Sequence, residues 1–74
     1  MAKYMYNGKI VSGARLIEIA REAFRKEPHG IGGTASEKIT THEKAYWFLT
    51  SEINREKRPS VKWWSARKGM WMGF

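Results

Sequence analysis

Residues 61–74, VKWWSARKGMWMGF, intersperse basic with aromatic side chains. This stretch holds three of the four tryptophans and three cations, and it contains no acid. Cations neutralise the phosphates of nucleic acids, and aromatic rings stack on bases or insert between them. The residue types therefore predict a surface that binds an anionic polymer. The competing interpretation is a hairpin stabilised by a cross-strand tryptophan pair, with a tip that is basic for solubility.

The same stretch predicts a β-hairpin closed by residues 66–69. In this register Trp64 pairs with Trp71 and Trp63 with Met72. Successive side chains on a strand point to opposite faces. The more continuously apolar face, which we assign to the core, carries Val61, Trp63, Met70, Met72 and Phe74. The other face carries Lys62, Trp64 and Trp71, with Arg67 and Lys68 at the tip.

Nucleic-acid contacts are expected from the cations within and just before this hairpin. Residues 57–68 contain five cations and no acid. The predicted contact residues are Lys57, Arg58, Lys62, Trp64, Arg67, Lys68 and Trp71. The second predicted helix adds secondary contacts through Lys44, Asn54 and Arg55, which can reach phosphate or base edges. Duplex DNA is the first choice of partner, and RNA and single strands are the alternatives.

An excess of positive charge supports this prediction. The 74-residue chain has a formal net charge of +7, from fourteen Lys and Arg against seven Glu, and so attracts polyanions. Eight of the cations and three of the acids lie in residues 38–74. The chain lacks the long apolar segment of a membrane span, so we expect a soluble cytoplasmic protein. Binding to an anionic membrane surface is the third choice, because the tryptophans are predicted in a paired hairpin and not along one side of a long amphipathic helix.

Catalytic and metal-binding constellations are poorly represented in the sequence. The chain has no Asp and no Cys, which excludes disulfides and cysteine-based zinc sites. Tyr46 stands where a helical zinc motif beginning at His42 needs its second His. Gly30, Gly32 and Gly33 lack the following Lys-Ser or Lys-Thr of a phosphate-binding P-loop. We predict no catalytic residues, no cofactor and no metal, and hence a protein that is not an enzyme.

The N-terminal stretch KYMYNGKIV predicts a second hairpin. Asn7-Gly8 between two runs of aromatic and β-branched residues is typical of a two-residue type I′ turn, and sets Tyr6 opposite Lys9. One face of this hairpin then carries Met5 and Ile10, and the other carries Tyr4, Tyr6 and Val11.

An amphipathic helix is predicted directly after this hairpin, with Ser12 as its N-cap and an end before the first proline. Its apolar positions are Leu16, Ile17, Ala20, Ala23 and Phe24. On the outer face, the spacing predicts that Glu18 pairs with Arg21 and Glu22 with Lys26.

A second helix is predicted to begin at Thr40, which forms a capping box with Glu43, and to continue until Pro59. Its apolar face is expected to contain Ala45, Phe48, Leu49 and Ile53, with Tyr46 at the margin. Trp47 falls outside this face. We expect the C-terminal segment to cover Trp47, and the alternative is that it lies exposed.

Together these elements predict one small α+β domain over residues 1–74: hairpin, helix, glycine-rich loop, helix, hairpin. The two hairpins can join into one antiparallel sheet with the helices on one side. Helix, helix, hairpin is also the order at the end of a winged helix-turn-helix, although here the inter-helix segment is longer and a hairpin replaces the usual first helix.

The expected function is non-catalytic nucleic-acid binding. The size and basic character would suit a small regulator of the kind that phages and mobile elements encode, although no motif specifies one. The alternative is a small protein-binding inhibitor or adaptor that uses exposed Trp, Arg and Lys on the same surface. The sequence leaves the oligomeric state open.

Overall fold

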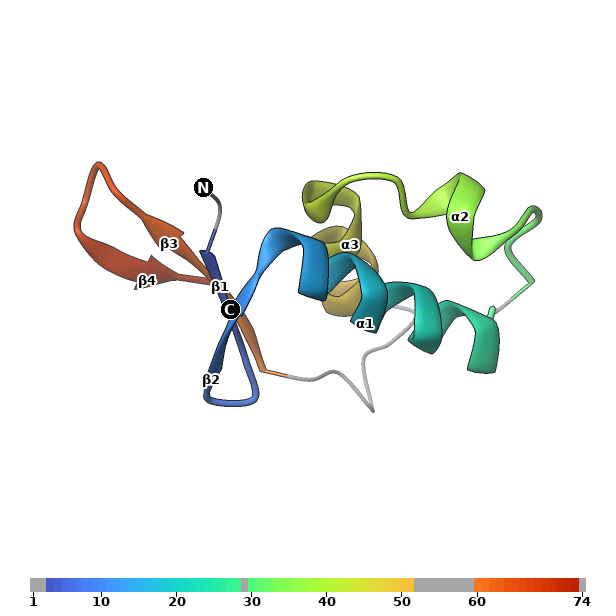
Figure 1. Cartoon of the computed structure of the whole chain (residues 1–74), viewed down its shortest axis with the longest axis horizontal. Coiled ribbons are helices and arrows are strands. Elements are labelled where there is room, and N and C mark those ends of the chain that lie inside the picture. Colours follow the sequence, from blue (N-terminus) through green and yellow to red (C-terminus); the bar gives the residue numbers. More distant parts are fainter. Residues whose placement is uncertain (1–2, 29, 52–59, 74) are drawn as a thin grey trace.

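The computed structural model describes residues 3–28, 30–51 and 60–73, and these contain four strands and three helices (Figure 1). In chain order the elements are β1 (Lys3–Tyr6), β2 (Lys9–Ser12), α1 (Gly13–Lys26), α2 (Ala35–Lys38), α3 (His42–Thr50), β3 (Val61–Ser65) and β4 (Met70–Met72). The predicted small α+β fold, with one hairpin before the helices in sequence and one after them, is confirmed. The short helix α2 is an addition to the two helices that the sequence predicted.

The first hairpin has the predicted turn and register. Asn7 and Gly8 both have positive φ angles, 49° and 85°, as a type I′ turn requires. Tyr6 lies opposite Lys9, and Tyr4 opposite Val11. Asn7 also bonds to the residue before β3: its backbone N–H donates to the Ser60 carbonyl at 2.8 Å, and its Oδ1 accepts from the Ser60 N–H at 2.9 Å. The turn residue thus fixes the position at which β3 begins.

The two hairpins join into one four-stranded antiparallel sheet of order β2-β1-β3-β4. In the central pair, Tyr4 of β1 lies opposite Trp63 of β3, and Tyr6 lies opposite Val61. The core takes Tyr4 and Val61 from this sheet, with Tyr6 and Val11 packed against them. The helices therefore cover the face that carries these residues, with α1 against β1 and β2 and α3 against β3.

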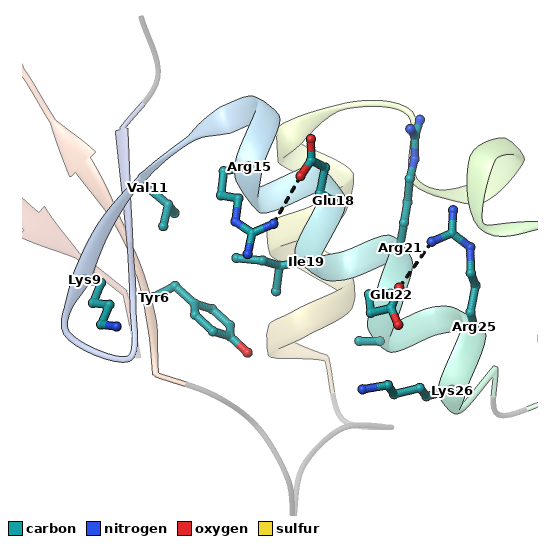
Figure 2. Close-up of a pocket in the computed structure, with 11 residues that line it drawn as sticks. Tyr6, Lys9, Val11, Arg15, Glu18, Ile19, Arg21, Glu22, Arg25 and Lys26 are labelled. Carbon is teal, nitrogen blue, oxygen red and sulfur yellow. Dashed lines mark hydrogen bonds and ion pairs between the residues drawn. The ribbon is translucent and has the colours of Figure 1, made fainter.

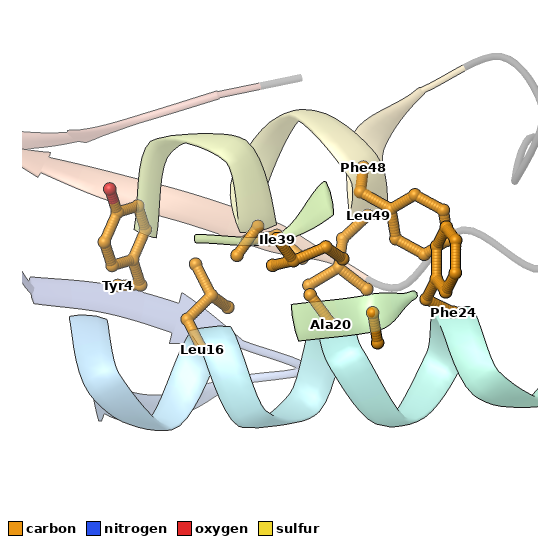
Figure 3. Packing of buried hydrophobic residues seen from close by; sticks show 10 residues of the cluster. Tyr4, Leu16, Ala20, Phe24, Ile39, Phe48 and Leu49 are labelled. Atoms are coloured by element: carbon orange, nitrogen blue, oxygen red, sulfur yellow. The ribbon is translucent and has the colours of Figure 1, made fainter. Parts of the chain in front are cut away.

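The core lies mainly between α1 and α3 (Figure 3). Leu16, Ala20 and Phe24 recur every four residues along α1, so they form one buried stripe. Phe24 meets Phe48 of α3 with ring centroids 5.6 Å apart and planes tilted by 53°. Ile39 lies in the segment between α2 and α3 and is only 2% exposed, so it also belongs to the core.

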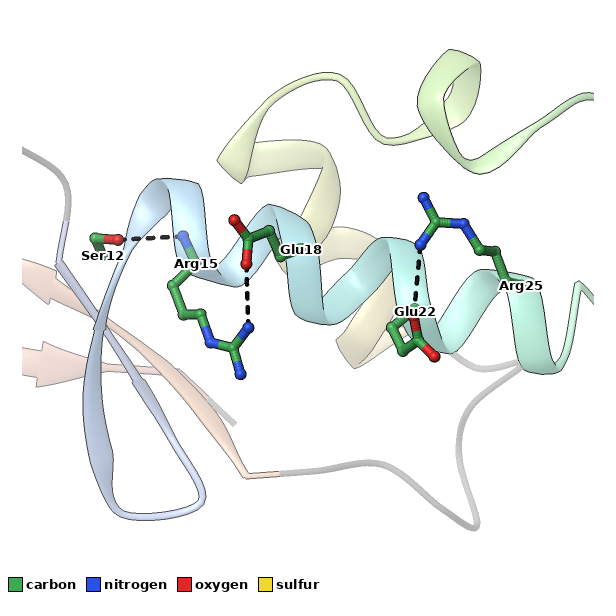
Figure 4. Close-up of polar contacts among 5 residues, drawn as sticks. All are labelled: Ser12, Arg15, Glu18, Glu22 and Arg25. Atoms are coloured by element: carbon green, nitrogen blue, oxygen red, sulfur yellow. Dashed lines mark hydrogen bonds and ion pairs between the residues drawn. The ribbon is translucent and has the colours of Figure 1, made fainter.

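The predicted N-cap of α1 is confirmed, but the predicted charge pairs on its surface are wrong. Ser12 accepts a hydrogen bond from the Arg15 backbone N–H at 3.1 Å (Figure 4). Glu18 pairs with Arg15 at 3.1 Å, and Glu22 with Arg25 at 3.5 Å.

Arg21, the predicted partner of Glu18, has a different role. Its Nε donates to the Ile39 carbonyl at 2.9 Å, which satisfies a carbonyl at the end of α2. Arg21 therefore connects α1 to the segment between α2 and α3.

The beginning and the end of α3 also differ from the prediction. Thr41, and not Thr40, is the N-cap, and its hydroxyl accepts from the Lys44 N–H at 3.2 Å. The helix ends at Thr50 and not near Pro59. Its C-cap residue, Ser51, has an extended backbone conformation with ψ of 163°. The Thr50 and Ser51 hydroxyls donate to the carbonyls of residues 46 and 48, both at 2.8 Å, and so satisfy the last turn. The rest of the predicted helix lies outside the described residues.

Substitution of the two adjacent threonines distinguishes the observed cap from the predicted one. We expect Thr41→Ala to lower the free energy of unfolding by about 1 kcal/mol, the usual cost of losing an N-cap hydroxyl. Thr40→Ala is the matched control, and we expect it to change that free energy by less than about 0.5 kcal/mol. Urea denaturation followed by circular dichroism measures both values. A larger loss for Thr40→Ala would contradict this cap assignment.

Candidate nucleic-acid interface

One face of the sheet carries basic and aromatic residues and has no described helix packed on it. Because directly paired residues point to the same side of a sheet, the pairing of Met5 with both Ile10 and Lys62 places these three side chains together. The core residues of β1 and β3 point to the opposite face. We call this surface the open face; it consists of Lys3, Met5, Ile10, Lys62, Trp64 and Trp71.

Trp64 and Trp71 form the aromatic pair predicted for the C-terminal hairpin. They lie directly opposite each other in the register, and their ring centroids are 5.3 Å apart with an interplanar angle of 69°. Such edge-to-face pairs stabilise a hairpin by about 0.5–1.5 kcal/mol beyond the area they bury. Trp64 nevertheless remains 38% exposed. The pair can therefore stabilise the hairpin and also offer a ring to a ligand.

The hairpin tip presents two exposed cations on an ordered turn. Arg67 and Lys68 lie in the turn between β3 and β4, and both are exposed. Ser65, the last residue of β3, forms two hydrogen bonds within this turn. Its carbonyl accepts from the Gly69 N–H at 2.7 Å, and its hydroxyl accepts from the Lys68 N–H at 3.2 Å. Gly69 has a φ of 64°, a conformation that suits glycine. The two cations are thus presented at a defined place.

Charge is segregated between the sheet and the helices. The two hairpins, residues 3–12 and 60–73, contain five cations and no acid. All glutamates among the described residues lie in the helices or in the segment following α1, and they are Glu18, Glu22, Glu27, Glu37 and Glu43. Lys9 is the one hairpin cation on the helix side of the sheet, opposite Tyr6. The sheet is therefore a positive surface without internal neutralisation.

The remaining predicted contact residues are only partly placed. Lys44 is exposed in the first turn of α3, an element separate from the open face. The predicted contacts Lys57 and Arg58, and the secondary contacts Asn54 and Arg55, lie outside the described residues. The structure thus brings together Lys62, Trp64 and Trp71 on one face, with Arg67 and Lys68 at its tip.

Two expectations about tryptophan burial are wrong. Trp63 has the predicted orientation, since it pairs with core residue Tyr4, but it is 39% exposed and thus as accessible as Trp64. The reason is that the C-terminal hairpin extends beyond the helical layer (Figure 1). Val61 at the start of β3 is 3% exposed, whereas Met70 near the tip is 52% exposed. Trp47 of α3 is not covered by the C-terminal segment and is 70% exposed.

These exposed tryptophans border a cleft between α3 and the projecting hairpin. Its volume is about 460 Å³, and its lining consists of Trp47, Trp63, Trp64, Tyr4, Tyr46 and the polar residues Lys3, His42 and Glu43. Sequence reasoning missed this cleft because it assigned Trp47 and Trp63 to buried positions. The mismatch between the length of β3 and the extent of the helical layer creates it.

A hydrogen bond between two residues that line the cleft joins the sheet to α3. The Tyr4 hydroxyl lies 2.6 Å from Nδ1 of His42. Burial raises the pKa of the Tyr4 hydroxyl above its ordinary value of 10.0, and the Glu43 carboxylate raises it further. Tyr4 therefore keeps its proton at neutral pH and donates it to Nδ1 in the tautomer of His42 that carries its proton on Nε2. Burial likewise raises the pKa of Tyr46.

A second hollow lies on the helix side of the first hairpin (Figure 2). Lys9 and Tyr6 of the hairpin face it, and α1 contributes a row of charged side chains. Its two glutamates, Glu18 and Glu22, are each paired with an arginine. Its remaining cations are Lys9, Arg21 and Lys26. Sequence reasoning had treated the α1 part of this surface as mutually neutralised.

Comparison with known proteins adds no family or function. No family model matches the chain, and neither a curated protein nor a solved structure is significantly similar to it. Within residues 3–28, 30–51 and 60–73, no three His or Glu side chains are grouped so that they could hold a metal ion. None of the helices in those ranges is long and apolar enough to cross a membrane.

Removal of the Tyr4 hydroxyl tests its bond to His42. We expect Tyr4→Phe to lower the free energy of unfolding by about 0.5–1.5 kcal/mol at pH 8, the usual worth of one hydrogen bond. Because the folded state holds the Tyr4 proton to higher pH than the unfolded state, this stabilisation declines as pH rises above about 10. In urea denaturation, the stability difference between wild type and variant should therefore stay constant up to about pH 9 and shrink as pH rises above about 10. A constant gap would contradict a raised pKa for Tyr4.

Proposed function

We propose that this protein binds nucleic acid without catalysis, with duplex DNA as the preferred partner, through the open face and the tip of the C-terminal hairpin. The single observation that carries the proposal is the charge segregation: five cations and no acid lie in the two hairpins that form the sheet. A cationic surface without internal ion pairs releases counterions from the phosphate backbone when it binds.

The shape of the hairpin supports duplex DNA. A two-stranded β-ribbon fits the major groove, which is about 12 Å wide. In this arrangement Arg67 and Lys68 at the tip and Lys62 on β3 contact phosphates, and Trp64 contacts sugar or base. Phosphate contacts fix the orientation of a protein on the duplex but do not read its sequence. Such a protein would serve as a small cytoplasmic regulator in which the tip sets affinity.

A protein-binding inhibitor or adaptor is the second candidate, and the 70% exposure of Trp47 favours it. Tryptophan and arginine are the residue types most enriched at protein-binding hot spots. The two candidates differ in their response to salt, because an apolar interface lacks the counterion release that governs binding to nucleic acid.

A salt titration tests the proposed function. If the open face and the neighbouring cations neutralise about five phosphates, log affinity for a duplex should fall against log salt concentration with a slope of about −4.5. Fluorescence anisotropy with labelled duplex DNA, single-stranded DNA and RNA measures the slope and the preference among the three. Absence of binding to all three at low salt would refute the proposal. A stoichiometric protein partner retained at high salt would favour the second candidate.

Charge reversal at the tip tests where the nucleic acid binds. We expect the double variant Arg67→Glu/Lys68→Glu to lose more than about 10-fold in duplex affinity and to lower the salt slope by about 2, because two phosphate contacts are removed. Circular dichroism checks that the fold is retained.

The matched control is Arg25→Glu/Lys26→Glu, at adjacent exposed positions near the end of α1. Both double variants lower the net charge of +7 by the same four units. We expect the control to lose less than about 3-fold in affinity, as a change in overall field would at moderate salt. Equal losses in the two variants would mean that overall charge, and not the tip, governs binding.

A further inference from the structure

The cleft between α3 and the projecting hairpin has the composition of a binding site for a planar ring. Trp47 and Trp63 are 70% and 39% exposed, and among the described residues neither side chain forms a ring pair or a hydrogen bond. They come from elements far apart in sequence, yet both line this cleft together with Tyr46. Its volume of about 460 Å³ lies within the usual range for small-ligand sites.

The polar groups at the cleft determine which ring it suits. Glu43 offers a carboxylate that accepts hydrogen bonds, and Lys3 offers an ammonium that donates them; both line the cleft. The Glu43 charge disfavours a phosphate, whereas amino and ring N–H groups of a base are donors that a carboxylate accepts. Aromatic surfaces stack on any base, because each base has a π face.

Charge complementarity identifies the source of the ring. Lys3 and Trp64, which belong to the open face, also line the cleft, so the cleft borders that face. The hairpins of the sheet carry five cations and no acid, and a base therefore enters the cleft most readily when its own backbone lies along the open face. We propose that the cleft accepts a single unpaired base of a nucleic acid bound to the open face, stacked against Trp63 and Trp47, with Glu43 and Lys3 contacting its polar edge. This inference rests on the proposed function.

The free energy needed to move a base out of the helical stack is lowest when the base is already unpaired. The protein should therefore bind a duplex with one unpaired adenine more tightly than the same duplex fully paired. Stacking of a base on an aromatic side chain is worth enough to change affinity by about 5- to 150-fold. The preference for the bulged duplex should lie in this range and should depend on the cleft tryptophans.

The experiment compares both duplexes and a single strand by fluorescence anisotropy, using wild-type protein and the variants Trp63→Ala, Trp47→Ala and Met70→Ala. We expect each tryptophan variant to lose at least about 5-fold on the bulged duplex and less than about 2-fold on the paired one. Met70→Ala is the matched control, because Met70 lies on the same face of the hairpin as Trp63 and is 52% exposed, but does not line the cleft. It should retain the preference. Trp47→Ala keeps the test valid if Trp63→Ala misfolds, since Trp47 is the more exposed residue.

The outcomes separate this inference from the proposed function. Equal affinity for the two duplexes, or a preference that survives both tryptophan substitutions, overturns the cleft proposal and leaves duplex binding in place. Binding only to single strands, lost on Trp63→Ala and Trp47→Ala, upholds the cleft and overturns the preference for duplex DNA. Binding to none of the three oligonucleotides overturns both.

Discussion

Antiparallel pairing between β1 and β3 is the interaction on which the rest of this structure depends. It joins two local hairpins, separated in sequence by all three described helices, into one sheet. It also brings Tyr4 and Val61 onto one side, where α1 and α3 cover them. Neither hairpin alone would be stable in water. The pairing therefore creates the buried face and, on the opposite side, the surface for which we propose a function.

The distribution of charge follows from this architecture. Each of the two acids on α1 forms an ion pair with an arginine one turn away. Exposed pairs of this kind add little stability, typically less than about 1 kcal/mol, but they reduce the field of the helical side. The strands have no acids with which to do the same. The described part of the molecule is consequently polarised, because residues 13–51 hold six cations and five acids whereas the two hairpins hold five cations and no acid.

Local chemistry in the sequence was sufficient to predict the hairpins, the register of Trp64 with Trp71 and the cap of α1, because each depends on neighbouring residues. The α3 cap was misplaced by one residue because Thr40 and Thr41 are chemically equivalent and only the backbone decides between them. A capping signal for α2 was present: Thr34 accepts from the Glu37 N–H and donates to its carboxylate. This signal was overlooked because Gly30, Gly32 and Gly33, which precede Thr34, are typical of a loop.

The exposure of Trp63 and Trp47 could not be predicted from local pattern. Alternation correctly placed Trp63 on the core side of the sheet, but whether a core-side residue is buried depends on how far the helical layer extends. That extent is set by the end of α3 at Thr50 and by the packing of α1 on α3. The two parts of the candidate site therefore differ in how well the sequence predicts them. The open face follows from the alternation of side chains along each strand, whereas the cleft depends on how the helices pack against the sheet.

The paired hydrogen bonds between Asn7 and Ser60 have a kinetic consequence. They close a loop of more than fifty residues, and such long-range contacts form late because the entropy of closing the loop precedes the gain from pairing. The first hairpin and α1 are local and can form within microseconds. We therefore expect the edge of β1 that pairs with β3 to stay unpaired during synthesis until β3 has emerged, and the bonds from Asn7 to help fix the register in which the two strands pair.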